Sequence, residues 1–431
     1  MSSLLKRPSR FAYYLSFILL LTSCTKELQN SSPNQADLLR SNLKTGRTSP
    51  AIQTARAGVI VSEHIHGFYE YLPKGYSSDI TKSYPVLICM HGIGQVGNGT
   101  TDLPGLLQYG PAMYINNGTF PTSFTVDGKT FGMIVITPQL TESGMFPIDI
   151  DSMIEYCKRN YRVDTNRVYL AGLSIGGANL WHYAGFSAAT ASKITAMVPI
   201  CAWTTPDHNY QVTQAEAQTV ANANIKIWQT HCYDDPTAMF SWSVNQADMV
   251  RSFSAPGSVS PKLTSFNSNS HDAWTTTYDP SYKESGMNIY QWMLHYAKGM
   301  TASPLVQKVP ANQVITIKGA NNFYLHNNND GSPLFLNSTT YTLWEGYTVI
   351  SVSGSKVALQ NQGNYVTKTN PNNVSCTATS ITSQETFLWI YNSDGSVSFQ
   401  SNNGKYISNN NGLVTCLATS IGTNEKFWIN W

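Results

Sequence analysis

The sequence has little charge of either sign. Asp, Glu, Lys and Arg make up only 12% of its 431 residues, and the formal net charge is +2. A protein that binds nucleic acid needs a strongly basic face, so no nucleic-acid partner is expected. The seven cysteines include no C-x-x-C pair of the kind that holds zinc. No metal site is therefore expected.

Long hydrophobic runs are missing after the first residues of the chain. Lys6, Arg7 and Arg10 precede an apolar stretch over residues 11–21, which is too short to span a bilayer as a helix. Leu-Thr-Ser-Cys at residues 21–24 follows and resembles a bacterial lipobox, in which the cysteine becomes the lipidated first residue.

This resemblance implies that residues 1–23 are a lipoprotein signal peptide and that Cys24 is the lipidation site. Thr25 follows in place of the Asp of an inner-membrane retention signal, so we expect an exported protein, lipid-anchored at the bacterial outer membrane or cell surface. An ordinary cleaved signal peptide followed by an unrelated cysteine is the alternative. Residues 24–57 are polar and are expected to form a flexible tether.

The most informative motif is Gly-Leu-Ser-Ile-Gly at residues 172–176, which fits the G-x-S-x-G pattern of a nucleophile elbow. Residues 167–171 are typical of a buried strand, and residues 178–184 are typical of a helix. Small residues flank the serine because the turn is too tight for larger side chains. Ser174 is therefore the expected nucleophile.

Apolar strand patterns alternate with helical patterns on both sides of this motif. This alternation predicts an α/β fold with a mostly parallel sheet and helices on both faces. Further strands are expected at residues 68–73, 86–90, 132–138, 194–201, 225–230 and 262–266, and helices at 149–160 and 284–298.

Two aspartates and one histidine complete a candidate catalytic triad. Asp234 and Asp235 follow the predicted strand 225–230, where this fold places the triad acid. His271 follows the last predicted strand, and the order Ser, Asp, His is that of the α/β-hydrolases. The residues alone leave both aspartates open, since Asp-Asp-Pro also suits a turn.

The loop after strand 86–90 is the expected second half of an oxyanion hole. His91-Gly92 opens this loop, and glycine allows the backbone to approach a substrate closely. We expect the backbone N–H groups of Ile93 and Ile175 to bind the oxyanion. His91 precedes the nucleophile, which is the wrong order for the base, so it is expected to structure the loop.

These pieces resemble the secreted esterase branch of the α/β-hydrolases, which contains feruloyl esterases, acetyl xylan esterases and polyhydroxybutyrate depolymerases. The resemblance covers residues 58–298 and includes the segment His-Asp-Ala-Trp at residues 271–274. It implies that Asp235 is the triad acid, although Cys232 stands where these families have glycine. A prolyl-peptidase-like hydrolase shares most of the same pieces.

Two cysteines stand out by position. Cys201 and Cys232 end two neighbouring predicted strands, so a disulfide bond between them is possible, although sequence alone does not assign it. Cys89 lies inside an apolar strand and is expected to be a buried small hydrophobe.

The C-terminal part of the chain contains an internal repeat. Tyr324, Tyr365 and Tyr406 recur at equal intervals in similar contexts, and Cys376 and Cys416 lie in two nearly identical segments. Three copies of about forty residues, each with several short strands, resemble a β-trefoil of the fascin-like or ricin-like type. The expected domains are a catalytic domain at 58–300, a linker at 301–311 and an all-β trefoil at 312–431.

The sequence thus predicts a serine esterase that removes feruloyl or acetyl groups from a polysaccharide, on which the trefoil holds the enzyme. This serine chemistry needs no organic cofactor. Because the trefoil contains no candidate catalytic group, cutting the chain after residue 301 is expected to leave turnover of small esters nearly intact. A peptidase or polyester depolymerase with the same triad is one alternative. A non-catalytic carbohydrate-binding lipoprotein is another, since a fold does not fix a function.

Overall fold

The computed structural model describes residues 51–430 except 256–257, 302–304 and 306–307. The expected signal peptide, the expected lipidation site Cys24 and most of the expected tether lie outside the described residues. Within the described part, no helix combines the length and the apolar character needed to cross a bilayer.

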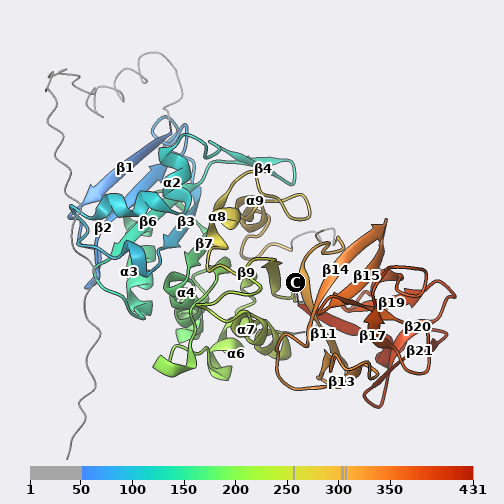
Figure 1. Ribbon diagram of the computed structural model, residues 1–431. Helices are drawn as coiled ribbons and strands as arrows, with labels where there is room; N and C mark the ends of the chain where they lie inside the picture. The colour runs from blue at the N-terminus through green and yellow to red at the C-terminus, as the bar shows by residue number, and fades with distance from the viewer. Residues whose placement is uncertain (1–50, 256–257, 302–304, 306–307, 431) are drawn as a thin grey trace, which may run out of the picture. The chain divides into compact units, whose positions relative to one another are not determined.

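Residues 51–301 contain one eight-stranded sheet, in the order β1-β2-β6-β3-β7-β8-β9-β10 (Figure 1). Strand β2 pairs antiparallel with both of its neighbours, and the pairs from β6 to β10 are all parallel. This arrangement confirms the predicted α/β-hydrolase fold. The strands are β1 (Ile52–Ala57), β2 (Ile65–Leu72), β3 (Tyr84–Met90), β6 (Ile134–Leu140), β7 (Val163–Leu173), β8 (Ala196–Ile200), β9 (Lys226–Cys232) and β10 (Lys262–Phe266).

The central strands are apolar throughout because both faces of the sheet are covered. Every residue of β3 is buried. Its side chains alternate, so that Ile88 packs into one hydrophobic cluster and Leu87 into another on the opposite face.

Helices cover both faces of this sheet. The first cluster includes side chains of α3, α4 and α6, and the second includes side chains of α2, α8 and α9. The helices are α2 (Pro111–Asn116), α3 (Pro147–Asn160), α4 (Ile175–Phe186), α5 (Ala188–Ala191), α6 (Gln214–Asn222), α7 (Phe240–Phe253), α8 (Trp274–Tyr278) and α9 (Ile289–Leu294). A short hairpin of β4 (Phe124–Val126) and β5 (Lys129–Phe131) lies outside the main sheet.

Most predicted elements differ from the observed ones by a few residues at their ends, and two elements differ by more. Residues 52–57, expected to belong to the tether, form β1, because they pair in register with β2. The helix expected at 284–298 is limited to α9. Ser285 and Gly286 have positive φ angles of 53° and 89°, which breaks the helix, and the Asn288 side chain then caps the N-terminus of α9.

Residues 314–430 form a closed barrel with three hairpins, which is the predicted β-trefoil. Six strands pair around the barrel in the order β11-β14-β15-β18-β19-β22, and β22 returns to pair with β11. The hairpins are β12–β13, β16–β17 and β20–β21, one in each repeat.

The trefoil strands have the following bounds. They are β11 (Val314–Gly319), β12 (Tyr324–His326), β13 (Phe335–Ser338), β14 (Gly346–Ser353), β15 (Lys356–Asn361), β16 (Asn364–Thr367), β17 (Ser375–Ala378), β18 (Phe387–Tyr391), β19 (Val397–Ser401), β20 (Tyr406–Asn410), β21 (Leu413–Ala418) and β22 (Phe427–Asn430).

The glutamate that recurs in each repeat has a structural part in the trefoil. The carboxylate of Glu385 accepts hydrogen bonds from the backbone N–H (2.9 Å) and the hydroxyl (2.5 Å) of Thr382. Glu345 makes the same pair of contacts with Thr342, and Glu425 accepts from the N–H of Gly422. All three glutamates are buried, so this repeated residue closes a turn in each copy.

The first trefoil strand contacts the last strand of the hydrolase sheet. Ser265 of β10 donates its hydroxyl to the carbonyl of Val314 (2.8 Å) and accepts from the N–H of the same residue (2.7 Å). Asp248 of α7 forms an ion pair with Lys318 of β11 (2.8 Å) and accepts a hydrogen bond from Tyr324. Phe240 of α7 packs against Tyr341, so polar and apolar contacts both join the two folds.

Candidate active site

Ser174 occupies the sharp turn between β7 and α4 in a strained conformation. Its φ of 53° and ψ of −120° lie outside the regions that residues other than glycine usually adopt. The strain is held by hydrogen bonds, since the Ser174 N–H donates to the carbonyl of Ile200 (2.8 Å) and its carbonyl accepts from the N–H of Trp203 (3.1 Å).

The glycines on either side of Ser174 are required by close backbone contacts. A Cβ atom on Gly172 would lie 2.6 Å from the carbonyl oxygen of Gly176. A Cβ atom on Gly176 would lie 2.5 Å from the carbonyl oxygens of Met90 and His91. The G-x-S-x-G pattern therefore reflects close packing within the elbow at Gly172 and packing of the elbow against the end of β3 at Gly176.

The three predicted triad residues lie in one hydrogen-bonded chain. The Ser174 hydroxyl lies 2.9 Å from Nε2 of His271, and Nδ1 of His271 lies 2.7 Å from Oδ2 of Asp235. They come from the elbow, from the loop after β10 and from the loop after β9. Because β7, β9 and β10 point the same way, their carboxyl ends bring these residues to one edge of the sheet.

Asp235, and not Asp234, faces the histidine. Asp234 is exposed, whereas Asp235 is buried and its Oδ1 accepts hydrogen bonds from the N–H groups of Thr237 (2.8 Å) and Ala238 (2.9 Å). Burial raises the pKa of the Asp235 carboxyl. The hydrogen bonds from histidines and from these backbone groups outweigh burial and lower the pKa below its usual value, so the carboxylate stays ionised.

His231 is a second histidine on the triad acid, and the sequence reasoning did not select it. Its Nε2 lies 2.9 Å from the carbonyl oxygen of Ala238 and 3.4 Å from Oδ2 of Asp235. Its Nδ1 lies 2.8 Å from the Ser243 hydroxyl of α7. The side chain is fully buried and thus fixes the loop that carries Asp235. The only sequence feature that could have indicated this role is the position of His231 near the end of β9, four residues before Asp235.

The loop after β3 approaches the nucleophile, as the oxyanion-hole prediction requires. A Cβ atom on Gly92 would lie 3.7 Å from Cβ of Ser174. Ile93 and Ile175 each begin a helical segment, a 3₁₀ turn and α4 respectively. The N–H at the start of a helix has no acceptor within that helix, so both groups can donate to a developing oxyanion.

His91 connects this loop to β6. Its Nε2 accepts the N–H of Leu140 (2.8 Å), and its Nδ1 lies 2.7 Å from the carbonyl oxygen of Gly92. Both contacts are satisfied by a neutral ring with its proton on Nδ1. Burial lowers the pKa of His91 to about 4, which keeps the ring neutral.

Aromatic side chains lie beside the triad. Trp274 stacks edge-to-face on His271 with ring centroids 5.2 Å apart, and Tyr109 contacts Trp274 at 5.8 Å. Trp203, which follows β8, contacts Tyr210 at 5.7 Å. The sequence motif identified Trp274, but Trp203 and Tyr109 lie in loops without a recognisable pattern.

Cys201 also lies next to the triad. Its Sγ, a carboxylate oxygen of Asp235 and a ring nitrogen of His271 all lie within 4.8 Å of one another. Among the described residues this is the group of three that could hold a metal ion. Two of its members, Asp235 and His271, already hydrogen-bond each other, and the Cys201 thiol lies beside them.

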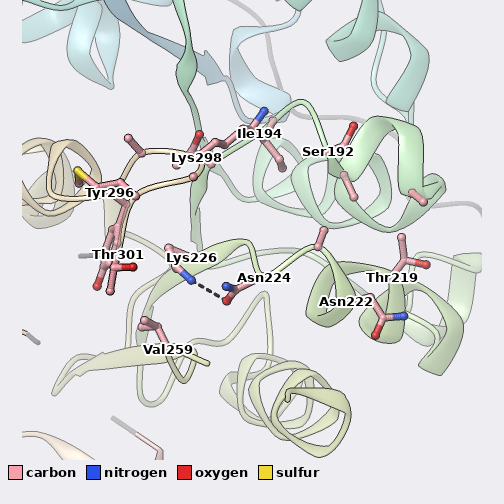
Figure 2. A pocket seen from close by; sticks show the side chains of 17 residues that line it. Ser192, Ile194, Thr219, Asn222, Asn224, Lys226, Val259, Tyr296, Lys298 and Thr301 are labelled. Carbon is pink, nitrogen blue, oxygen red and sulfur yellow. Dashed lines mark hydrogen bonds between the residues drawn. The ribbon is translucent and has the colours of Figure 1, made fainter. Parts of the chain in front are cut away.

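A cavity of about 780 Å³ lies elsewhere in the hydrolase fold (Figure 2). Its lining includes Thr195, Lys226 and Lys298, near the amino ends of β8 and β9. Figure 2 shows the Lys226 ammonium donating to the Asn224 side chain (2.6 Å). Because the triad lies at the carboxyl ends of the parallel strands, this cavity is at the opposite edge of the sheet and holds no triad residue.

Comparison with known proteins gives two kinds of match. A model of the Fascin domain matches residues 345–429. No protein of curated function matches the sequence.

Among solved structures, a thermostable esterase is 15% identical over 57% of this chain, with a TM-score of 0.40. The chain spans 63% of that esterase, which is less than two thirds of its length. A ferulic acid esterase is 16% identical, with a TM-score of 0.38 over 52% of this chain and 93% of its own. The designed three-fold symmetric protein ThreeFoil is 14% identical, with a TM-score of 0.26 over 27% of this chain and 98% of its own.

Proposed function

We propose that this protein is a serine esterase that removes feruloyl or acetyl substituents from a polysaccharide. The observation that carries the proposal is the hydrogen-bonded chain from Ser174 through His271 to Asp235, at a strained elbow. A serine hydroxyl becomes a useful nucleophile when an imidazole accepts its proton. Here the hydroxyl, the ring and the carboxylate lie within hydrogen-bond distance of each other in the order that this chemistry needs.

In the acylation step, the Ser174 oxygen attacks the ester carbonyl carbon and its proton passes to Nε2 of His271. Asp235 holds the proton on Nδ1 and stabilises the imidazolium that forms. The carbonyl oxygen gains negative charge, which the N–H groups of Ile93 and Ile175 bind together with the positive end of α4. The tetrahedral intermediate then collapses to the acyl-enzyme as its bond to the sugar oxygen breaks, and the imidazolium gives its proton to this oxygen, so that the sugar leaves with a free hydroxyl.

In the deacylation step, water takes the place of the sugar. His271 accepts a proton from this water, which attacks the acyl-enzyme carbonyl through the same oxyanion site. The tetrahedral intermediate collapses to free acid, and the proton returns from Nε2 to the Ser174 oxygen. The cycle needs side chains, backbone N–H groups and water.

The substrate class and the location are part of the same proposal. Aromatic rings beside the triad suit a feruloyl group and the faces of sugar rings, and the low charge of the chain suits a neutral polymer. The trefoil would hold the enzyme on this polymer, and a lipid on Cys24 would anchor it at the bacterial outer membrane or cell surface. The protein would contact the membrane through this lipid alone.

The first test is hydrolysis of chromogenic acetate and ferulate esters by the purified protein. Ser174→Ala should lower kcat/KM by about 10⁴-fold or more, and a fluorophosphonate probe should label the wild type but not the variant. Equal turnover by the two proteins would contradict the proposal. A panel that adds amides and polyesters tests the bond, since faster turnover of an amide than of every ester would instead indicate a peptidase.

The two adjacent aspartates provide a matched pair of variants. Asp235→Asn should lower kcat by about 10⁴-fold, because an amide favours the wrong imidazole tautomer. Asp234→Asn removes the same charge from the neighbouring, exposed residue, and its kcat should stay within about twofold of that of the wild type. The reverse order of effects would show that Asp234 acts as the acid.

A further inference from the structure

Two buried cysteines lie at the carboxyl ends of neighbouring strands, next to the triad. Cys201 directly follows β8, and its N–H donates to the carbonyl of Thr230 on β9 (2.9 Å). Cys232 is the last residue of β9. Ile200 and Thr230, which precede the two cysteines by one and two residues, are register partners on these parallel strands, and both cysteine side chains are fully buried. All six described cysteines are free thiols in the structure, and Cys201 and Cys232 are the two of them that lie at the carboxyl ends of neighbouring parallel strands.

The two cysteines lie next to the segments that position the three triad residues. Cys201 follows Ile200, whose carbonyl accepts the N–H of Ser174 (2.8 Å). On the other strand, Cys232 is three residues before Asp235, and its Sγ lies 3.9 Å from the hydroxyl of Ser270, the residue before His271. A covalent link between the two cysteines would therefore connect the segments that position all three triad residues.

We propose that Cys201 and Cys232 form a disulfide bond that fastens the carboxyl ends of β8 and β9 beneath the triad. The bond forms by exchange with a low-molecular-weight disulfide such as glutathione disulfide. The Cys232 thiolate attacks one sulfur of the oxidant and releases one thiol; the Cys201 thiolate then displaces the second. Two protein thiols lose two protons and two electrons, and one glutathione disulfide becomes two glutathione thiols.

The local chemistry favours this order. Hydrogen bonds from the Cys201 thiol and then from Ser270 lower the pKa of the Cys232 thiol, which makes Cys232 the attacking thiolate. Burial raises the pKa of Cys201, which suits the second step. Because both thiols are inaccessible in the folded chain, the exchange is expected while the chain folds.

The other described cysteines do not offer the same arrangement. Cys89 and Cys157 belong to clusters on opposite faces of the sheet. Cys376 and Cys416 each place Sγ against a backbone carbonyl, that of Asn364 (3.2 Å) and that of Lys405 (3.9 Å) respectively.

The test begins with the full-length chain folded in the presence of oxidised and reduced glutathione. The product is denatured with an excess of N-ethylmaleimide, and its mass and peptide map are compared with those of a sample reduced beforehand. We expect two fewer alkylated thiols in the unreduced sample and a linked peptide that contains Cys201 and Cys232. Alkylation of both cysteines without prior reduction, or a link to other partners, would overturn the proposal.

Thermal unfolding tests whether the bond fastens the strands. Reduction should lower the Tm of the wild type by roughly 5–10 °C and leave the Tm of Cys201→Ala and Cys232→Ala unchanged. Cys157→Ala is the control and should keep the full drop, because this buried thiol lies away from the pair. If the peptide map shows the disulfide but reduction leaves the Tm unchanged, the bond does not stabilise the two strand ends. The peptide map decides on the bond even if a variant fails to fold.

Discussion

At the scale of single residues, His91 shows how burial sets a protonation state with a structural purpose. The neutral ring accepts one backbone N–H on Nε2 and donates from Nδ1. A second proton would remove the acceptor and place a charge in an apolar site. The loop that carries the Ile93 donor therefore depends on His91 remaining uncharged.

This dependence predicts an acid-sensitive stability. An unfolded histidine titrates near pH 6.5, whereas the pKa of His91 in the folded chain is about 4. Between these values the unfolded chain binds more protons, so the free energy of unfolding falls as the pH falls, by about 3 kcal/mol in total. This contribution is fully present above the unfolded pKa.

Urea unfolding of the wild type and of His91→Gln at pH 7 and pH 4.5 measures this term. The variant should be less stable at pH 7 but should lose less stability on acidification. His208→Gln, at an exposed position, should follow the wild type at both pH values. Parallel losses in all three proteins would show that His91 is not responsible.

The residues of the triad could be found from sequence because they occupy fixed places in a motif and in chain order. The choice between Asp234 and Asp235 depends on the turn backbone, which directs one carboxylate to His271 and the other to solvent. His231 and Trp203 could not be recognised, because contacts with distant segments give them their positions. Such contacts leave no local pattern.

At the scale of elements, the elbow depends on the absence of a side chain at Gly176. Gly176→Ala would place a methyl group against two backbone carbonyls of β3 and its loop, neither of which can move alone. We expect a loss of stability of about 3 kcal/mol and a large loss of ester turnover, measured by urea unfolding and by the chromogenic assay. Gly94→Ala, in the same region but with open space around its Cβ position, should change stability by less than about 0.5 kcal/mol. Similar effects of the two substitutions would contradict this account of the elbow.

Element prediction succeeded where burial left a regular apolar pattern. The central strands are apolar at every position, and helix α3 has apolar residues at helical spacing, so both left clear patterns. Strand β1 was assigned to the tether because it lies at the sheet edge and is only half-buried. Its six residues alternate too weakly to be distinguished from a polar linker.

At the scale of the whole molecule, the contacts between β10, α7 and β11 bear on the predicted effect of removing the trefoil. That the trefoil supplies no catalytic group, and that small esters are still turned over after its removal, stay predictions. The cut would, however, expose Phe240 and Leu263 and deprive Asp248 of Lys318. The truncated hydrolase should therefore unfold at a lower temperature than the full chain.

Two chemically similar ion pairs allow the stability contributed by the contact between the trefoil and α7 to be measured. Lys318 and Lys426 each lie 2.8 Å from an aspartate, the first at the contact with α7 and the second on the trefoil surface. Lys318→Met leaves a mostly buried carboxylate short of a partner and should lower the free energy of unfolding by about 2 kcal/mol. Lys426→Met should lower it by less than about 1 kcal/mol. Chemical denaturation of the full-length variants distinguishes the two, and equal small losses would mean that the contact adds little stability.

The repeat was visible in the sequence because each copy reuses the same turn and core residues. The contact with the hydrolase was not, since Asp248 and Lys318 belong to segments that only the folded chain brings together.

The return of β22 to β11 has a consequence for the history of such chains. Thr316 pairs with Asn430, so this barrel starts and finishes at a single seam. Because the two ends of such a domain lie close together, it can be duplicated or fused to an unrelated enzyme without a change in the enzyme's own fold. Closure of the barrel thus makes the trefoil a domain that gene fusion can add to other proteins.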